Sequence, residues 1–227
     1  FTRIMSTDQV GMVNLYSSWY SMITVVSTLA LTSGGFSIAL REFESERDQY
    51  VSSVLSLTSL VAIGLVFLYA LEPSFWNRMT GLPTHLMILL LVGLLVAPAR
   101  DFWLSRQRFE YRYKLSGAVT IVSAVAASGL AVAAVLYANS IDFSDIASVR
   151  LCANYSIVYG VAAVIWLSIF LKGKCFYSSK YWKFSLQLSL PLIGYSIASQ
   201  ILSVSDRLMI SKMVGNSAVG VYSTLYT

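Results

Sequence analysis

Charged residues beside long apolar stretches are the residues of this sequence with the most chemistry to offer. Asp206 and Arg207 are adjacent in the stretch "SVSDRLMISKMVGNSAVGVYST", and Arg41 and Arg100 each follow another apolar stretch. A guanidinium group pairs with carboxylates and binds phosphate oxygens through two parallel hydrogen bonds. The three arginines are therefore our candidates for binding an anionic group of a substrate, and Asp206 beside Arg207 is a fourth substrate-binding candidate.

Catalytic and cofactor patterns are missing from the sequence. Cys152 lies in an apolar stretch and Cys175 in a polar one, a placement that suggests neither a disulfide nor a metal site. The sequence holds no phosphate-cradling G-x-x-x-x-G-K-[ST] loop, no H-E-x-x-H and no G-x-S-x-G. We therefore expect neither an enzyme nor a bound cofactor or metal.

Composition places these residues in a membrane protein. Hydrophobic residues make up 56% of the chain and charged residues only 12%, which is too apolar for an ordinary soluble domain. Apolar runs of about 20 residues, long enough to cross a bilayer, recur along the chain between short polar segments. The sequence therefore predicts an all-α polytopic membrane protein.

Six transmembrane spans are bounded by these polar segments. A seventh apolar segment starts at Ser217. The predicted spans are Val10 to Leu40, Tyr50 to Ala70, Thr84 to Pro98 or slightly beyond, Leu115 to Tyr137, Val149 to Leu171 and Phe184 to Met213.

Orientation follows from the basic residues, because loops rich in Lys and Arg near span ends stay on the cytoplasmic side. Eleven of the sixteen basic residues follow spans one, three and five: Arg41, Arg47, Arg100, Arg106, Arg108, Arg112, Lys114, Lys172, Lys174, Lys180 and Lys183. These spans therefore run from outside to inside. Topology accounts for the net charge of +5, and we expect no nucleic-acid partner.

Helix breakers mark candidate hinges. Gly34 and Gly35 lie inside the first span, which at about 46 Å exceeds the ~30 Å hydrocarbon core and must tilt, bend or protrude. Pro191 lies inside the sixth span, where it removes a helix hydrogen bond and permits a kink. The fourth span, "SGAVTIVSAVAASGLAVAAV", is rich in small residues and is expected to pack closely on its neighbours.

The two ends of the sequence resemble each other. Arg3 to Tyr16, "RIMSTDQVGMVNLY", aligns without gaps on Lys212 to Leu225, "KMVGNSAVGVYSTL", with Val10-Gly11 opposite Val219-Gly220. Six spans separate the copies, and an even number preserves direction, as in membrane proteins built from two parallel repeats. The sequence begins without Met and ends in an open apolar segment. We therefore expect a piece of a longer chain, with most of a first lobe (1–172), a cytoplasmic linker (173–183) and the start of a second lobe (184–227).

A family resemblance covers nearly the whole chain. The stretch "SLQLSLPLIGYSIASQILSVSDRLMISKMVGNSAVGVYST" resembles the seventh-helix region of Wzx-type polysaccharide (O-antigen) flippases, with "SLPL", "DRLMIS" and the small-residue "VGxYS" ending in the same order. The stretch "MSTDQVGMVNLYSSW" is similar to the loop and second helix of the same proteins. The resemblance implies the fold of the multidrug/oligosaccharidyl-lipid/polysaccharide exporters, a two-lobed, MATE-like helical bundle. This chain would hold about six complete transmembrane helices and partial helices at both ends.

The resemblance also implies a function. Such proteins move a polyprenyl-diphosphate-linked oligosaccharide across the bacterial inner membrane by alternating access. The implied partners are that lipid-linked oligosaccharide, membrane lipids, and the polysaccharide polymerase and chain-length machinery. The diphosphate headgroup is taken up from the cytoplasmic leaflet, which makes Arg41 and Arg100 candidate ligands for it. Both residues equally suit ordinary interface anchors.

Arg207 has two interpretations. It lies 24 residues after Lys183, about 36 Å along a helix, which places it close to the outer interface. It either snorkels and pairs with Asp206 or a neighbouring helix, or it faces the cavity between the lobes and holds diphosphate or sugar groups during release.

Two other functions stay open. A cation-coupled multidrug exporter of the same superfamily would usually carry a carboxylate deep in a lobe, and no Asp or Glu lies at the centre of the six predicted spans. A membrane glycan polymerase or ligase would carry a large outer loop with catalytic Arg or His, and the predicted outer loops are short. The glycan flippase therefore leads.

Overall fold

Helices running along one axis form the molecule. The computed structural model describes residues 4–33 and 35–226, of which residue 33 and residues 224–226 are described in backbone alone. The described part of the chain holds helices and no strands. The helices are α1 (Thr7–Ser27), η1 (Leu31–Ser33), α2 (Gly35–Glu42), η2 (Glu44–Glu46), α3 (Arg47–Leu71), α4 (Pro73–Thr80), α5 (Thr84–Phe109), α6 (Tyr113–Ser140), α7 (Ile146–Gly173), α8 (Ser179–Met213) and α9 (Asn216–Tyr226).

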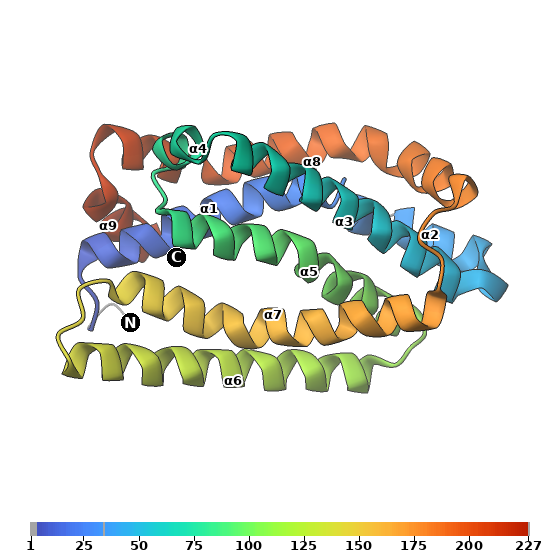
Figure 1. The fold of residues 1–227 in the computed structure, drawn as a ribbon, viewed down its shortest axis with the longest axis horizontal. Helices are drawn as coiled ribbons and strands as arrows, with labels where there is room; N and C mark the ends of the chain where they lie inside the picture. Colours follow the sequence, from blue (N-terminus) through green and yellow to red (C-terminus); the bar gives the residue numbers. More distant parts are fainter. Residues whose placement is uncertain (1–3, 34, 227) are drawn as a thin grey trace.

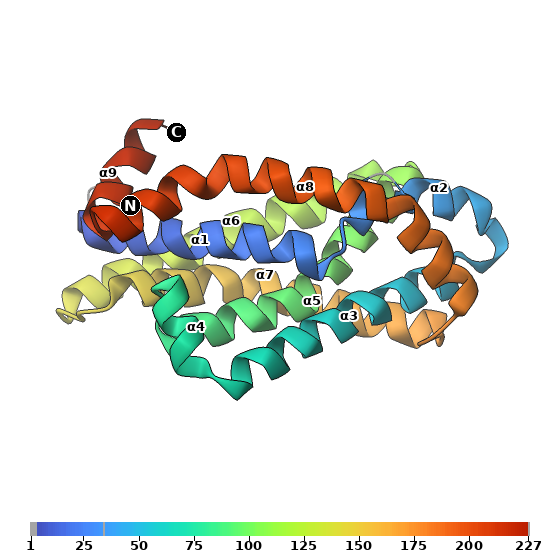
Figure 2. The same ribbon diagram turned by 90° about the horizontal axis from the view of Figure 1, so that it is seen from above.

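Five helices in the described residues are long and apolar enough to cross a membrane. They are α3 together with η2, α5, α6, α7 and α8, and they correspond to the second to sixth predicted spans. The long helices lie side by side along the long axis of the molecule (Figures 1 and 2). The prediction of an all-α, multi-pass membrane protein is therefore confirmed.

The connections between helices place most of the basic residues at one end of the molecule. The α2–α3, α5–α6 and α7–α8 connections all lie at the right-hand end of Figure 1, which we call the basic end. These connections and the helix turns beside them carry most of the Lys and Arg residues predicted to share one side of the membrane. Helix α4, the α6–α7 connection and the α8–α9 connection lie at the opposite end (Figure 1).

The prediction of one continuous first span was wrong. Helix α1 ends at Ser27, and Leu29 and Ala30 both adopt the left-handed backbone conformation, with φ of 51° and 50°. Such residues end an α-helix, and burial of Ala30 and Leu31 holds the break in place. The bend expected in this overlong span therefore lies just before the predicted hinge. Gly35 is the first residue of α2, and Gly34 lies outside the described residues.

The third predicted span was too short. We expected it to end at Pro98 or slightly beyond, but α5 continues through this proline to Phe109. Pro98 is buried within α5, and its ring leaves the carbonyl of Leu94 without its usual helical donor. Arg100 and Asp101 consequently lie inside α5, with about two more helical turns between them and its end.

Two apolar clusters make up the core. One fills the half of the bundle opposite the basic end, around Tyr16, Leu86 and Leu90, and the other fills the half at the basic end, around Phe36 and Phe102. Helix α6 packs on α7 through small residues, as its sequence predicted, and turns larger apolar residues outward. Its buried small residues are Ser116, Ser123, Ala127, Ala131 and Ala138.

Helix α8 is bonded to α3 at its first turns and packs along α1 further on. The hydroxyls of Tyr50 and Ser185 lie 3.0 Å apart, and the indole Nε1–H of Trp182 donates to the carbonyl oxygen of Ser53 at 3.0 Å. Further along, α8 is largely exposed, and its axis changes direction in Figure 2. Pro191 lies inside the helix and leaves the carbonyl of Gln187 without its usual helical donor.

Candidate functional site

A polar cavity of about 160 Å³ lies where α3, α5 and α7 meet at the basic end. Helix α3 begins there, whereas α5 and α7 end there. Acidic groups favour helix N-termini and basic groups favour C-termini, so this antiparallel arrangement brings both kinds together. The cavity is lined by Asp48, Val51, Trp103, Arg106, Gln107, Glu110, Arg112, Ser168, Ile169 and Lys172.

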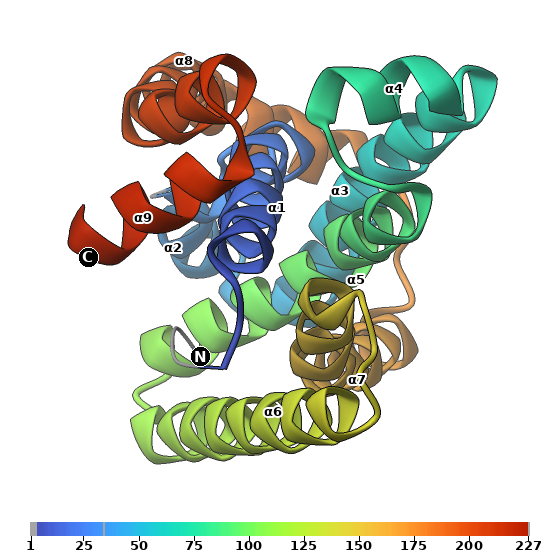
Figure 3. The ribbon, with the colours of Figure 1, turned by 90° about the vertical axis from the view of Figure 1, so that its left-hand side faces the viewer.

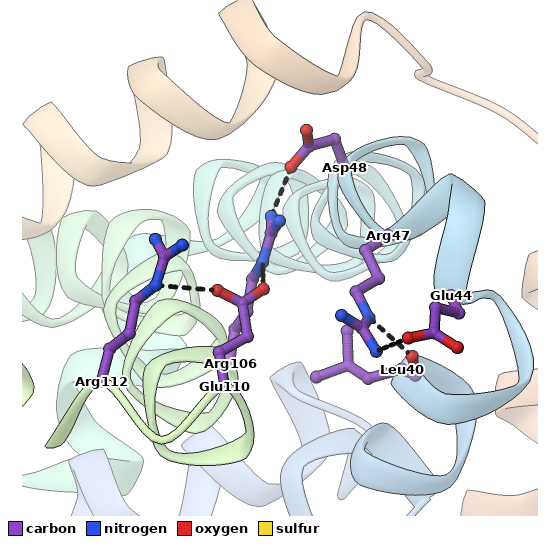
Figure 4. Close-up of polar contacts among 7 residues, drawn as sticks. All are labelled: Leu40, Glu44, Arg47, Asp48, Arg106, Glu110 and Arg112. Carbon is purple, nitrogen blue, oxygen red and sulfur yellow. Dashed lines mark hydrogen bonds and ion pairs between the residues drawn. The ribbon is translucent and has the colours of Figure 1, made fainter.

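Arg106 ties α5 to α3 across this cavity. Its Nη1 lies 2.5 Å from Oδ1 of Asp48, and its Nε lies 2.8 Å from Oε1 of Glu110 (Figure 4). Arg112 adds a longer pair, with Nε 3.7 Å from Oε2 of Glu110. Two carboxylates thus hold the Arg106 guanidinium, which makes it a structural tie between helices.

The free positive charge lies at the mouth of the cavity. The side chain of Arg112 is 68% exposed, and among the described residues its one ion pair is the 3.7 Å contact with Glu110. Lys172 is exposed at the end of α7, and no ion pair with it is found among the described residues. A methyl group on the neighbouring Gly173 would overlap the Asp48 carbonyl oxygen, so this glycine allows α7 to end directly against α3.

Gln107 is an incompletely bonded group on the cavity wall. Its side chain is only 6% exposed, and its Oε1 has no hydrogen-bond partner in the described part of the chain. Buried amides normally have partners, and an amide can both donate and accept. A water molecule or a polar ligand in the cavity would satisfy it.

A second, wider cavity of about 490 Å³ continues the first toward the α2–α3 corner. The two share Asp48, Arg106, Glu110 and Lys172. Arg47 fixes the corner, since its Nε donates to the carbonyl oxygen of Leu40 at 2.9 Å and its Nη2 pairs with Glu44 at 3.3 Å (Figure 4). The two cavities together are lined by five basic side chains (Arg47, Arg106, Arg112, Lys172, Lys174) and four acidic ones (Glu44, Glu46, Asp48, Glu110).

Arg41 and Arg100 lie outside the linings of these two cavities. Arg41 is exposed in the last turn of α2. Arg100 is half-buried inside α5, and its Nε is buried without a hydrogen-bond partner in the residues that the structure describes. Asp101 beside it is exposed.

Asp206 and Arg207 lie toward the far end of α8, opposite the basic end, as the sequence predicted. Asp206 accepts a hydrogen bond of 3.0 Å from the hydroxyl of Tyr222 on α9. Within the described ranges no ion pair joins Asp206 to Arg207. The carboxylate therefore links α8 to α9.

His85 forms a polar cluster at the end opposite the basic end. Its Nε2 lies 2.6 Å from Oγ of Ser148 and 3.4 Å from Oδ2 of Asp145. A serine, histidine and acid relay would place the acid on the other ring nitrogen, so this arrangement is not that of a catalytic triad. It ties the start of α5 to the start of α7.

Comparison with protein families decides the class of this molecule. The family model described as "Polysaccharide biosynthesis protein" matches residues 1–227. The chain belongs to this family. Its members are generally transporters rather than enzymes, in agreement with the predicted resemblance to polysaccharide flippases. No curated protein and no solved structure gives a significant match.

The sequence analysis identified the basic segment after the third span, but it did not predict the ion pairs within that segment. Arg106 and Glu110 are four residues apart, the spacing at which two side chains meet on a helix. Recognising "RDFWLSRQRFEYRYK" as the last turns of a helix would have predicted this pair. The partnership of Arg106 with Asp48, 58 residues away, has no signal in the sequence.

Proposed function

We propose that this polysaccharide biosynthesis protein is a flippase that moves polyprenyl-diphosphate-linked oligosaccharide across the bacterial inner membrane by alternating access. Its two lobes would be residues 1–172 and the part that begins at residue 184, joined by a cytoplasmic linker at 173–183. No covalent step is part of this proposal. The observation that carries it is the match of the whole chain to a polysaccharide biosynthesis family.

The charge distribution supports the direction of transport. Basic loops stay in the cytoplasm, so the basic end would face the leaflet in which a lipid-linked intermediate is assembled. A diphosphate is recognised best by guanidinium and ammonium groups that are not already paired. Lys172 meets this requirement, Arg112 is held only by a long 3.7 Å pair with Glu110 and is 68% exposed, and Gln107 offers a further polar contact.

The predicted ligands have places along the same route. Arg41 and the partly buried Arg100 lie on α2 and α5 toward the basic end, where they would accept the headgroup after its capture. Arg207 lies near the opposite end, where it would act during release, and Asp206 beside it links α8 to α9. The polymerase and chain-length machinery would then take over the product on the outer side.

Depletion of the protein in its host tests this function. The lipid-linked oligosaccharide in each leaflet is quantified with a glycan-modifying enzyme added outside the inner membrane. A flippase predicts accumulation of carrier that is protected from the enzyme, and re-expression reverses it. An unchanged leaflet distribution after depletion would rule out this function.

One observation favours a cation-coupled exporter as the second candidate. The sequence placed Asp101 at the end of a span, whereas α5 carries it about two helical turns before its end, within the length of a membrane-spanning helix. Asp101→Asn would then abolish efflux of organic cations and the dependence of efflux on the Na⁺ or H⁺ gradient. For the glycan flippase, the same variant leaves the leaflet distribution close to that of the wild type.

A further inference from the structure

The first turns of α1 and α9 cross in direct backbone contact. Gly11 and Gly220 are both buried, each four residues into its helix. A methyl group on Gly11 would overlap the carbonyl oxygen of Asn216, and a methyl group on Gly220 would overlap that of Thr7. Figure 3 shows α9 lying against this part of α1. Only glycine permits such an approach.

The crossing has an internal two-fold pattern. The alignment of the two chain ends pairs Thr7 with Asn216 and Gly11 with Gly220. Thr7 and Asn216 are also the first residues of α1 and α9. Gly11 therefore contacts Asn216, and Gly220 contacts Thr7, the residue equivalent to Asn216. Reciprocal contact of this kind defines an isologous interface, here between two repeats of one chain.

The neighbouring side chains continue the contact. The hydroxyls of Thr7 and Ser217 lie 2.8 Å apart across the crossing. The equivalent residues Val10 and Val219 are 9% and 0% exposed. We call this contact, formed by Thr7, Val10 and Gly11 with their partners Asn216, Ser217, Val219 and Gly220, the glycine seam. It lies at the end opposite the basic end (Figures 1 and 2).

We propose that the glycine seam is the closed gate at this end of the protein, and that α1 and α9 separate there to release the transported molecule. The second half of this statement rests on the proposed transport function. Backbone contact without bulky interlocking side chains suits a contact that must break and re-form as a unit. The basic end remains polar and open to its cavities in the same structure.

The reciprocal geometry sets a specific expectation for substitutions. A methyl group at either glycine meets a backbone carbonyl, which has no alternative rotamer. Gly11→Ala and Gly220→Ala should therefore open the seam to a similar extent. Once one substitution has separated the helices, the second should have little further effect, because the effects of substitutions within one contact are not additive.

Cross-linking tests the seam in native membranes. Thr7→Cys and Ser217→Cys are introduced together after replacement of Cys152 and Cys175 by serine. Mild oxidation followed by denaturation and a maleimide mass tag reports the bridge, since bridged chains take up no tag. We expect rapid, reducible protection, and cross-linking at least about tenfold slower in each alanine variant, as backbone overlap of this kind predicts.

Gly160→Ala is the matched control, because a methyl group there meets no atom within 4 Å. It should cross-link at the parent rate. A parent rate in Gly11→Ala, or an effect of only one of the two glycines, would overturn the two-fold seam.

The oxidised pair also separates the gate from the proposed function. Full oxidation of the otherwise normal protein should stop transport of lipid-linked oligosaccharide, and reduction should restore it. Continued transport with a complete bridge would overturn the gate. Cross-linking needs no substrate, so a protein that bridges as expected but never alters the glycan distribution would refute the flippase function and leave the seam standing.

Discussion

The two ends of this molecule are held together in different ways. At the basic end, long charged side chains of α3, α5 and α7 meet around Arg106, which lies between Asp48 and Glu110. At the opposite end, α1 and α9 meet through backbone at Gly11 and Gly220. The first contact joins helices that lie close in one predicted lobe, and the second joins the two copies of an internal repeat.

This difference indicates what each end can do. Ion pairs with short distances and defined partners fix the position of α5 relative to α3. The glycine crossing depends on the close approach of two backbones, with the Thr7–Ser217 hydroxyl contact beside it, and is lost as soon as the helices separate. We therefore expect substitutions at the glycine seam to change conformation, and substitutions around Arg106 to change stability.

The largest effect is expected for Gly220→Leu. A leucine side chain cannot fit between α9 and the carbonyl of Thr7, so the seam should stay open and transport should fall about 100-fold, as for a severe overpacking of 2–3 kcal/mol. The loss of transport is measured from the distribution of lipid-linked oligosaccharide between the two leaflets in cells. Gly160→Leu on α7 is the control, and equal loss in both variants would contradict the comparison.

Glu110→Gln should be the most destabilising change at the basic end. It removes a carboxylate from both Arg106 and Arg112 and leaves Arg106, whose side chain is 23% exposed, with Asp48 alone. Losing a charged partner of a mostly buried group costs about 1–3 kcal/mol. Thermal unfolding of the purified protein in detergent measures this cost.

Glu44→Gln provides the matched control for Glu110→Gln. It also removes a carboxylate from an arginine, but the Glu44 side chain is 79% exposed. An exposed pair contributes at most about 1 kcal/mol, so its unfolding temperature should stay close to that of the wild type. Equal decreases of the unfolding temperature in the two variants would show that the ion pairs of Arg106 stabilise the protein no more than an exposed pair does.

Joint replacement of Arg112 and Lys172 by glutamine tests whether these residues bind substrate, in contrast to Arg106, which holds helices together. These side chains provide the free charge of the cavity, so headgroup capture should weaken about tenfold while the unfolding temperature stays unchanged. The dependence of transport on the concentration of lipid-linked oligosaccharide in proteoliposomes reports it. Lys174→Gln, on the wider cavity only, should have a smaller effect.

The smallest effect is expected for Asp206→Asn. The amide can still accept from the Tyr222 hydroxyl, so α8 and α9 should remain linked and cross-linking of the seam should slow less than about threefold. A large loss of transport with normal cross-linking would instead assign Asp206 to substrate binding.

Much of the architecture was predictable because the signals are local. Apolar runs and their polar boundaries gave five long helices at nearly correct positions, and basic residues gave the end at which their connections gather. The break at Leu29 and Ala30 was not predictable, since neither residue type favours a left-handed backbone and only burial in the folded chain maintains it.

The polar contacts were less accessible than the helices. The sequence singled out isolated arginines at span ends, but Arg106 acquires its role from Asp48 on a distant helix. The repeat that pairs Gly11 with Gly220 was visible in the sequence, yet nothing in the alignment indicated that the two copies touch. Both contacts arise from tertiary packing between residues far apart in the chain, and no local pattern of a single sequence predicts such packing.

A reciprocal contact between two copies of one surface is also the contact of a symmetric homodimer. The two glycine contacts would fit two separate polypeptides as well as two parts of one chain, because Gly11 meets Asn216 and Gly220 meets the equivalent residue Thr7. Duplication and fusion of an ancestral dimer would leave such a trace. Its two glycines would then be constrained as a pair, since a change in one spoils a contact that the other also makes.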